Sequence, residues 1–473
     1  MTLRHFDLCI LGAGSGGLSV AAGAARMGAS VALVEHGKMG GDCLNSGCVP
    51  SKSLLASAHA AAGARQADRL GIVAGIPPID QRRVRDHIAD VIAALAPHDS
   101  VEKFEQLGVT VIAGQACFAG PAEVAAGDER IRARRFVIAT GSLPVVPAIP
   151  GLAAVPYLTN ETVFELDELP AHLLVLGGGP MGVELGHAFQ RLGAQVTIIE
   201  QATILPHHDP ELVAVLRRCL SDEGIVVREG AQLQHVRRAG RQIIARIEDG
   251  AGAAELTGSH LLVAVGRRPA LENLALSKAE IRHSPAGIIV NSRLRTTNRR
   301  VFALGDVIDG PQFTHVAAYQ AGIVLRNALF NWPARVDLGA APRVIYTHPE
   351  LAQVGLSEPE ARTLYRNVRV LRAPFALNDR AQTERDTSGL VKVVVTSHGH
   401  VLGAGIVGAG AGDLIQTWVL AIAQRLNVKA IATMIAPYPT RGEANKRAAG
   451  EYFAPKLFSE TVRRIVRLMS HLP

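Results

Sequence analysis

The chain contains the same strand, glycine turn, helix and strand pattern twice, and this repeat constrains the fold more than any other feature. In the first copy, an apolar run at residues 6–11 leads into a glycine-rich turn at residues 12–17. An alanine-rich helical stretch follows, then a second strand that ends at Glu35. In the second copy, the turn at residues 177–182 is followed by a helix and a strand that ends at Glu200. Each acid lies about 20 residues after the first glycine of its turn, as in dinucleotide-binding units.

Each copy has the features that bind a dinucleotide. Glycines let the backbone approach a pyrophosphate, and the helix N-terminus offers free N–H groups and the positive end of its dipole. The acid accepts hydrogen bonds from ribose hydroxyls. Two purely structural glycine turns would not explain why strand, turn, helix and acid coincide twice, so we expect two bound dinucleotides. The glycines expected at the two phosphate sites are Gly12, Gly14, Gly17, Gly177, Gly179 and Gly182.

Glu200 also predicts which nicotinamide dinucleotide the second unit prefers. Its carboxylate would repel a 2′-phosphate, and the next residue, Gln201, adds no positive charge. We therefore expect NAD, with NADP less favoured.

The composition is that of a globular α/β protein. The 473 residues are 48% hydrophobic and 19% charged, and 47 of them are glycine. At about 150 residues per domain, this length suggests two to four domains. Subtracting the 42 acidic from the 49 basic residues gives a net charge of +7. That charge is spread along the chain, which does not indicate nucleic-acid binding.

We expect a cytoplasmic protein. No apolar run reaches the roughly 18 residues needed to span a bilayer. Residues 8–25 have the apolar character of a signal peptide, but several glycines interrupt them and favour a buried strand, turn and helix. The chain has five cysteines, and in that compartment a disulfide is expected to be redox-active rather than structural.

The segment at residues 40–52 carries two of those cysteines, Cys43 and Cys48, directly after the first unit. A helix predicted from about residue 51 to residue 67 places both near a helix N-terminus, where the dipole stabilises a thiolate. Lys52 adds a positive charge. A zinc site would need two more ligands at a matching spacing, so we expect no resident metal. The remaining alternative is a pair of buried free thiols.

With these motifs, the sequence resembles the class I pyridine nucleotide–disulfide oxidoreductases, which include dihydrolipoamide dehydrogenase, glutathione reductase and mercuric reductase. The resemblance extends over nearly the whole chain, and its most specific part is the cysteine segment. The matching segments are residues 12–17 with Glu35, 40–52, 139–141, 177–184 with Glu200, 266–269, 305–306, 347–350 and 438–443.

The resemblance implies FAD in the first site, NAD(P) in the second and a homodimer paired through the C-terminal domain. The expected fold is α/β, with two Rossmann-like domains and a C-terminal α+β dimerisation domain. We expect a discontinuous FAD-binding domain at residues 1–150 and 271–341. An NAD(P)-binding domain is expected at 151–270, and the dimerisation domain at 342–473.

The resemblance also implies a mechanism. NADH would give hydride to the flavin, which would reduce a Cys43–Cys48 disulfide. Cys48 would be the thiol next to the flavin, and Cys43 would exchange with the substrate. Lys52 would lie beside the flavin, held by an ion pair with Glu184, which could instead be a solvated helix charge. Asp306 would bind the ribityl chain or cap a helix. The other cofactor contacts implied are Ala116, Thr140, Gly141, Gly266, Arg267, Gly305 and Thr314.

Near the C-terminus the sequence departs from the disulfide reducers of this family. These carry a histidine, supplied by the partner subunit and oriented by a glutamate, as the base for the exchanging thiol. This chain has Tyr438 at that position and keeps Glu443. Tyrosine, with an ordinary pKa of about 10, is a poor base at neutral pH. Ordinary dihydrolipoamide or glutathione chemistry is therefore in doubt, and His315 and His348 are candidates to replace the base.

With a tyrosine at this position the sequence resembles mercuric reductase, but that enzyme also carries a cysteine pair near its C-terminus. In this chain the last cysteine is Cys219, so a dedicated mercury enzyme is not expected. We predict a mercuric-reductase-like enzyme whose acceptor is a small-molecule or protein disulfide, a quinone or a metal ion. Dihydrolipoamide dehydrogenase is the alternative.

Residues 459–472 suggest a function of another class. One broad face carries apolar side chains and the other carries arginines, which is typical of a helix at a membrane surface. The chain could then act as a redox module in peripheral contact with a membrane. The alternative is a terminal helix that packs on its own dimer. The apolar residues are Val462, Ile465, Val466, Leu468 and Met469, and the basic ones are Arg463, Arg464 and Arg467.

Overall fold

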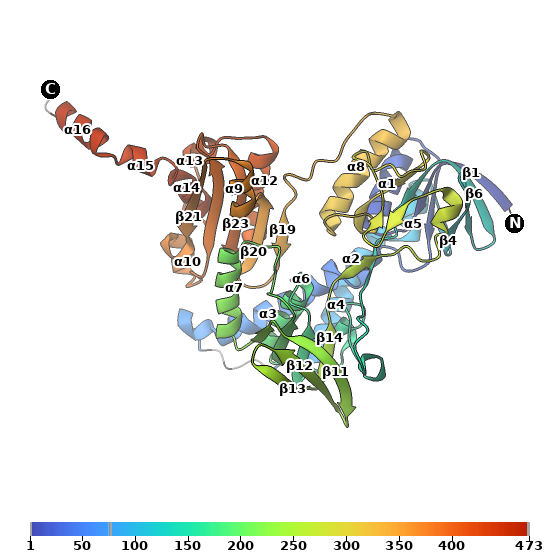
Figure 1. Cartoon of the computed structure of the whole chain (residues 1–473), viewed down its shortest axis with the longest axis horizontal. Helices are drawn as coiled ribbons and strands as arrows, with labels where there is room; N and C mark the ends of the chain where they lie inside the picture. The colour runs from blue at the N-terminus through green and yellow to red at the C-terminus, as the bar shows by residue number, and fades with distance from the viewer. Residues whose placement is uncertain (1, 74, 76–77, 471–473) are drawn as a thin grey trace.

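The computed structural model describes residues 2–73, 75 and 78–470. It contains two Rossmann-like dinucleotide-binding domains and a C-terminal α+β domain (Figure 1). The expected fold class is therefore confirmed. His471 and Leu472, which belong to the predicted amphipathic segment, lie outside the described residues.

The first domain is built on a sheet whose central strands are parallel and are buried along their apolar runs at residues 8–11, 31–34 and 136–138. Helices α1 (Ser15–Arg26) and α8 (Thr314–Phe330) lie side by side. The strand order is β3-β2-β1-β6-β5-β4, and β18 pairs with β6. The strands are β1 (Thr2–Leu11), β2 (Val31–Glu35), β3 (Val109–Ala113), β4 (Ala116–Gly120), β5 (Glu123–Ala126), β6 (Glu129–Ile138) and β18 (Val301–Ala303).

Strand β18 enters this sheet from far along the chain, with Val301 opposite Phe136. The sheet thus takes strands from both sides of the segment that forms the second domain. This pairing supports a discontinuous first domain, although the predicted boundaries at residues 150, 271 and 341 stay a prediction. The two connections run side by side as the antiparallel pair β7 (Ser142–Pro144) and β15 (Arg267–Pro269).

The second domain has a four-stranded parallel sheet in the order β10-β9-β8-β14, with α6 (Pro180–Leu192) after β8 and α7 (Pro210–Asp222) after β9. A three-stranded antiparallel sheet lies beside it, and the sequence analysis did not foresee that sheet. The parallel strands are β8 (His172–Leu176), β9 (Gln195–Glu200), β10 (Val226–Glu229) and β14 (His260–Val263). The antiparallel ones are β11 (Gln232–Ala239), β12 (Gln242–Asp249) and β13 (Gly252–Gly258).

Helix α3 (Cys48–Arg65) connects the first two domains. It follows the short helix α2 (Gly41–Asn45), and its side chains Leu54, Leu55 and Ala58 belong to the core of the second domain, where α3 lies against α6. The helix begins three residues before the predicted start at residue 51. Pro50 lies in the first turn of α3, where the N–H groups have no partner within the helix, so proline is tolerated there. Helices α4 (Gln81–Leu95) and α5 (Val101–Gln106) follow.

The third domain is an antiparallel sheet in the order β19-β20-β23-β22-β21, and Trp418 is buried in its core. The β-rich runs of the sequence at residues 368–371, 391–396 and 401–407 lie in β21, β22 and β23. The strands are β19 (Arg343–Ile345), β20 (Glu350–Gly355), β21 (Val368–Pro374), β22 (Leu390–Thr396) and β23 (Val401–Gly408). The helices are α9 (Glu358–Leu364), α10 (Asp379–Thr383), α11 (Ala411–Leu414), α12 (Gln416–Ala423), α13 (Lys429–Thr433) and α14 (Glu443–Gly450). Two further helices, α15 (Ala454–Leu457) and α16 (Glu460–Met469), extend away from this domain (Figure 1).

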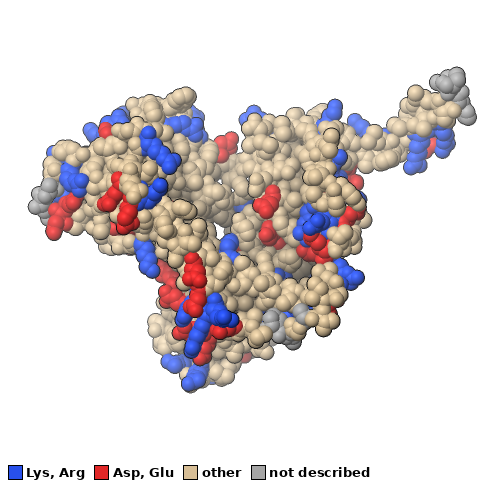
Figure 2. Space-filling view, turned by 180° about the vertical axis from the view of Figure 1, so that it is seen from behind, with Lys and Arg blue, Asp and Glu red and all other residues tan. Residues whose placement is uncertain are grey.

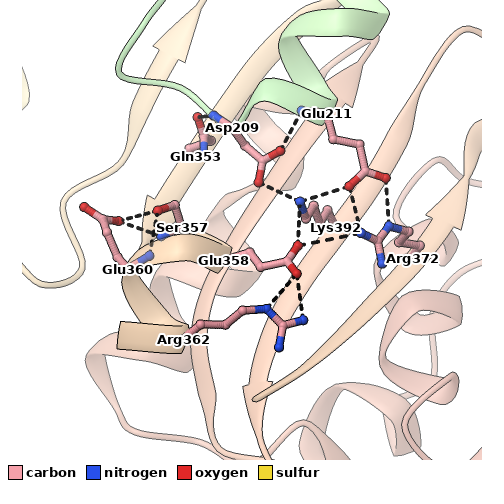
Figure 3. A network of polar contacts seen from close by, with 9 residues as sticks. All are labelled: Asp209, Glu211, Gln353, Ser357, Glu358, Glu360, Arg362, Arg372 and Lys392. Carbon is pink, nitrogen blue, oxygen red and sulfur yellow. Dashed lines mark hydrogen bonds and ion pairs between the residues drawn. The ribbon is translucent and has the colours of Figure 1, made fainter. Parts of the chain in front are cut away.

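A buried lysine joins the second and third domains (Figure 3). Lys392 Nζ, from β22, lies 2.8 Å from Asp209 Oδ2 and 2.9 Å from Glu211 Oε2 at the start of α7. It also lies 3.1 Å from Glu358 Oε2. Asp209 caps α7 by accepting the Glu211 N–H, and Arg372 donates to both carboxylate oxygens of Glu211. One ammonium group therefore contacts three carboxylates, of which Glu211 and Glu358 also pair with an arginine.

We expect Lys392→Met to destabilise the protein by about 3–5 kcal/mol, because it leaves the buried Asp209 carboxylate without its counter-charge. Arg362→Met, which removes an exposed pair with Glu358 four residues earlier, is the matched control and should cost less than about 0.5 kcal/mol. Urea unfolding of the two variants measures both values. Equal effects of the two substitutions would contradict this role of Lys392.

The same cluster predicts a dependence on pH. Hydrogen bonds from Arg372 lower the pKa of Glu211 to about 2. A carboxyl group whose pKa is lowered by folding stabilises the fold at pH values above its ordinary pKa, which is about 4.3 for glutamate. This contribution is lost as the pH falls through about 2. The urea concentration at which half of the protein is unfolded should therefore decrease as the pH is lowered from about 4.3 to about 2. The fall should be less steep in Lys392→Met, which lacks one of the charges that Glu211 binds.

Candidate active site

One cavity of about 960 Å³ connects the first glycine turn to the cysteine pair. It collects residues from both Rossmann-like domains and from the start of the third. The predicted residues that line it are Gly12, Gly14, Glu35, Cys43, Cys48, Lys52, Ala116, Thr140, Gly141, Glu184, Arg267, Gly305, Asp306 and Thr314.

The end of the cavity at the first glycine turn fits FAD. Gly12 has a φ of +103°, and a Cβ on it would lie 2.5 Å from the Ala139 carbonyl oxygen. A Cβ on Gly17 would lie 1.9 Å from the Gly12 carbonyl oxygen, so Gly17 lets α1 start close to β1. The first residues of α1 line the cavity, and their N–H groups suit a pyrophosphate. Glu35, at the end of β2, lies where a ribose would be bound.

The two cysteines lie in the same cavity with free thiols. Cys43 is in α2, and Cys48 is the first residue of α3, where its Sγ lies 3.4 Å from Thr314 Oγ1. A hydrogen bond from the Cys43 thiol lowers the pKa of Cys48 to about 6, and Thr314 and the charge of Lys52 act in the same direction against the effect of burial. The same S–H···S hydrogen bond, together with burial, raises the pKa of Cys43. Cys48 is therefore the thiol of the pair that loses its proton more readily.

Asn160 holds the loop between the cysteines, and the sequence analysis did not find it. Its buried Nδ2 donates to Asp42 Oδ1 at 3.0 Å and to the Ser46 carbonyl oxygen at 3.1 Å. Ser46 also donates its hydroxyl to Asp42 at 2.7 Å. In the sequence, Asn160 stands out only as part of an Asn-Glu-Thr glycosylation pattern, which gives no indication of this role.

The predicted ion pair between Lys52 and Glu184 is present, with 2.8 Å between Nζ and Oε2. Glu184 is buried, and its other carboxylate oxygen accepts the backbone N–H of Tyr346 at 2.9 Å. The Tyr346 ring lies 4.3 Å from Lys52 Nζ. An acid from α6 and an aromatic ring from the segment before β20 thus hold the ammonium group at the cavity wall beside Cys48. Tyr346 was not identified from the sequence, because nothing local marks it as a neighbour of α3.

Asp306 does not cap a helix. Its carboxylate accepts the Ser142 hydroxyl at 2.8 Å, and burial raises its pKa. Arg267 donates to the same hydroxyl at 2.8 Å and lies 3.4 Å from Asp42. These side chains line the cavity together, so the pair β7–β15 carries cavity residues as well as connecting the domains.

The second glycine turn has the same construction as the first. Gly177 has a φ of +109°, and a Cβ on it would lie 2.4 Å from the Ala264 carbonyl oxygen. A Cβ on Gly182 would lie 2.0 Å from the Gly177 carbonyl oxygen, while Gly179 and Gly266 have open space at that position. Glu200 accepts the backbone N–H of Gly178 at 2.7 Å. A second cavity, of about 530 Å³, follows this acid and is lined by Gln201, Ala202, Gly230, Gln232, Glu248 and Asp249.

The second turn also reaches the large cavity, because Pro180 and Met181 at the start of α6 line it beside Glu184. A dinucleotide bound at the second turn could therefore extend through this cavity toward Lys52 and the two cysteines. The residues present fit an NAD-type dinucleotide at this site.

Tyr438 and Glu443 do not line the cavity of their own chain. Tyr438 is 70% exposed, and its hydroxyl donates to Asp379 Oδ2 at 3.0 Å, which raises its pKa. Glu443 accepts the Thr440 N–H at 3.2 Å and makes no hydrogen bond to Tyr438. The structure therefore places neither residue beside the cysteines of the same subunit.

Of the two histidines suggested as replacement bases, only His315 lines the cavity. Its Nε2 lies 2.9 Å from the Pro342 carbonyl oxygen, and its ring stacks on Phe313. His348 lies instead beside Asp386, with 3.5 Å between Nε2 and Oδ2. Neither histidine makes a hydrogen bond to Cys43 or Cys48 in the described part of the chain.

Across residues 2–73, 75 and 78–470, no three His, Cys, Asp or Glu side chains gather as ligands for a metal ion. Over the same residues, no helix combines the length and the apolar character needed to cross a membrane.

Comparison with known proteins places this site in a family. The model described as pyridine nucleotide-disulphide oxidoreductase matches residues 6–321, and the model for the dimerisation domain of that family matches residues 341–449. The second match indicates a homodimer. A mercuric reductase of Streptomyces lividans is 38% identical, over 94% of this chain and 95% of that protein. A dihydrolipoyl dehydrogenase of Thermus scotoductus is 36% identical, over 94% of this chain and 97% of that protein.

A solved structure shows the same arrangement. The Cu(II) complex of the HOCl-induced flavoprotein disulfide reductase RclA from Escherichia coli superposes with a TM-score of 0.84. It is 28% identical, over 93% of this chain and 98% of that one.

The coupling between the two thiols gives a direct prediction. In the reduced protein, one thiolate should form with a midpoint near pH 6, measured by its ultraviolet absorbance. Thr314→Val and Lys52→Met should each move the midpoint upward, because they remove a hydrogen-bond donor and a positive charge. Cys219→Ser, which removes a cysteine whose pKa burial raises, is the control and should leave the midpoint unchanged. A midpoint near the ordinary value of about 8.5 would show that the pair is not coupled in this way.

Proposed function

This chain belongs to the class I pyridine nucleotide–disulfide oxidoreductases, a family of FAD- and NAD(P)H-dependent enzymes. From that premise we propose that it oxidises NADH and passes the electrons by way of Cys43 and Cys48 to a thiophilic metal ion. The observation that carries this proposal is Tyr438, an exposed tyrosine with a raised pKa where the disulfide reducers have a base.

The cysteine pair has the chemistry that a soft cation requires. Thiolate sulfur is a preferred ligand of soft metal ions, and Cys48 is the thiol of the pair that loses its proton more readily. When bound, FAD supplies the two-electron chemistry between the nicotinamide and the dithiol. A hydrogen bond from the Cys43 thiol lowers the pKa of Cys48 most, and Thr314 and the charge of Lys52 act in the same direction. Cys43 holds its proton until a metal ion displaces it.

Tyr438 makes a disulfide or dithiol substrate less suitable. Exchange with such a substrate needs a group that takes or gives a proton at the exchanging sulfur. We propose that Tyr438 and Glu443 approach the cavity of the partner subunit in the homodimer, as the family resemblance implies. There the tyrosine, with its raised pKa, would not act as a base. A metal ion needs no such base, because binding to a thiol releases the proton directly.

The electron balance is simple. One NADH reduces one Hg²⁺ to Hg⁰, or two Cu²⁺ to two Cu⁺, and releases NAD⁺ and one proton. Similar proteins support this class of acceptor, since one is a mercuric reductase and another has a structure as a Cu(II) complex. This chain has no cysteine after Cys219, so Cys43 and Cys48 would bind the ion without a C-terminal cysteine pair.

The acceptor is tested by NADH oxidation in purified, FAD-loaded protein, with Hg²⁺ supplied as a small-thiol complex or Cu²⁺ supplied as its glycine complex. Dihydrolipoamide with NAD⁺, glutathione disulfide and a quinone serve as the comparison. We expect turnover with a metal ion that falls to the background rate in Cys43→Ser and Cys48→Ser, while both variants keep their flavin. Fast turnover with dihydrolipoamide and none with the metals would instead identify a dihydrolipoamide dehydrogenase.

Position 438 gives a gain-of-function test. Tyr438→His should raise the dihydrolipoamide rate by about 10²-fold, because it restores a base whose pKa lies near neutrality. Tyr438→Phe is the control and should leave this rate unchanged. If the two variants behave alike, Tyr438 does not determine the acceptor.

We further propose that the nicotinamide dinucleotide is NADH. The Glu200 carboxylate, at the end of β9, would repel a 2′-phosphate, and Gln201 beside it is neutral. Gln201→Arg should lower the ratio of kcat/KM for NADH to that for NADPH, since it adds a positive charge at the second cavity. Gln201→Met is the neutral control. A wild-type preference for NADPH would contradict this proposal.

A further inference from the structure

Helix α16 is an amphipathic helix that the proposed reaction does not use. The Ser459 hydroxyl caps it by accepting the Val462 N–H at 3.4 Å. Its apolar residues recur at the helical spacing that forms one continuous stripe. That stripe is Val462, Ile465, Val466 and Met469, with Leu468 at its flank.

No other part of the subunit that the structure describes buries the apolar stripe. Ile465 and Val466 are 48% and 59% exposed, and no residue of α16 is buried. In the described part of the chain, no hydrogen bond or ion pair joins residues 460–469 to any residue before Ser459. The helix instead extends from the third domain, beyond α15 (Figure 1). An apolar stripe of this kind is stable only when something outside the subunit covers it.

The opposite half of the helix is basic. Arg463, Arg464 and Arg467 lie there, with Glu460 as the single acid, 3.9 Å from Arg464. Figure 2 shows blue and red side chains along the lower edge of the outer part of the projecting tail, with tan atoms above them. The surface that covers α16 must therefore accept apolar side chains and carry negative charge beside them.

We propose that α16 docks the protein on an anionic lipid surface. An anionic bilayer satisfies both halves of the helix, because the stripe enters the acyl boundary while the arginines stay among the lipid phosphates. At ten residues, α16 is about 15 Å long, half of what a membrane-spanning helix needs, so it lies in the plane of the surface.

A second copy of the chain is a poorer partner for this helix. Each copy has a net charge of +7, so it offers no excess of acid to the arginines. The match to the family's dimerisation domain also ends at residue 449, before α15 begins. The segment that pairs subunits in the family therefore leaves α16 outside.

Co-sedimentation of the full-length, FAD-loaded protein with vesicles tests the proposal. We expect binding to vesicles rich in phosphatidylglycerol, little binding to phosphatidylcholine vesicles, and weaker binding as salt is added. Ile465→Ser with Val466→Ser should abolish the binding. Changing all three arginines to glutamine should weaken it by about fivefold per arginine, and changing them to lysine should preserve it.

A matched control is Leu3→Ser with Met27→Ser, which alters two exposed apolar side chains of the first domain and should leave vesicle binding unchanged. The flavin absorbance and molar mass of each variant show whether fold and dimer are retained. Absence of wild-type binding at low salt overturns the proposal, as does equal binding of the stripe variant. If the stripe variant lowers the molar mass and no vesicle binding is seen, a second copy covers α16 and the lipid proposal is wrong.

Discussion

The ion pair between Lys52 and Glu184 is the contact on which the rest of the site depends. It joins α3, which starts at Cys48, to α6, which starts at the second glycine turn. The same glutamate accepts the Tyr346 N–H and so attaches the chain leading into the third domain. One buried carboxylate therefore fixes three parts of the structure around the dithiol. Breaking such a pair leaves a buried charge uncompensated, which costs several kcal/mol.

This arrangement explains why α3 belongs to the core of the second domain although it follows the first in sequence. Leu54 and Leu55 pack in that core, and each buried leucine contributes about 1.5–3 kcal/mol. The packing keeps Cys48 at a fixed place between the two dinucleotide sites. The thiolate character of Cys48 then comes from its neighbours Cys43, Thr314 and Lys52.

Both Rossmann-like units could be predicted from the sequence because a glycine turn, a helix start and an acid are local features with fixed spacing. The Lys52–Glu184 pair and most of the cavity residues followed from the family resemblance. Asn160 and Tyr346 could not be predicted, because their roles arise from contacts between segments far apart in the chain. The antiparallel strands β11–β13 were missed since they contribute nothing to the motifs. The predicted start of α3 was three residues too late.

In the proposed reaction, electrons from NADH reach the cysteine pair before they leave the protein. Anaerobic addition of NADH to the oxidised, FAD-loaded protein, followed by alkylation and peptide mapping, tests it most directly. The account predicts two new thiols per subunit, located at Cys43 and Cys48, and their loss when one equivalent of Hg²⁺ as its thiol complex is added before alkylation. Flavin reduction with no new thiols at these two positions would contradict it.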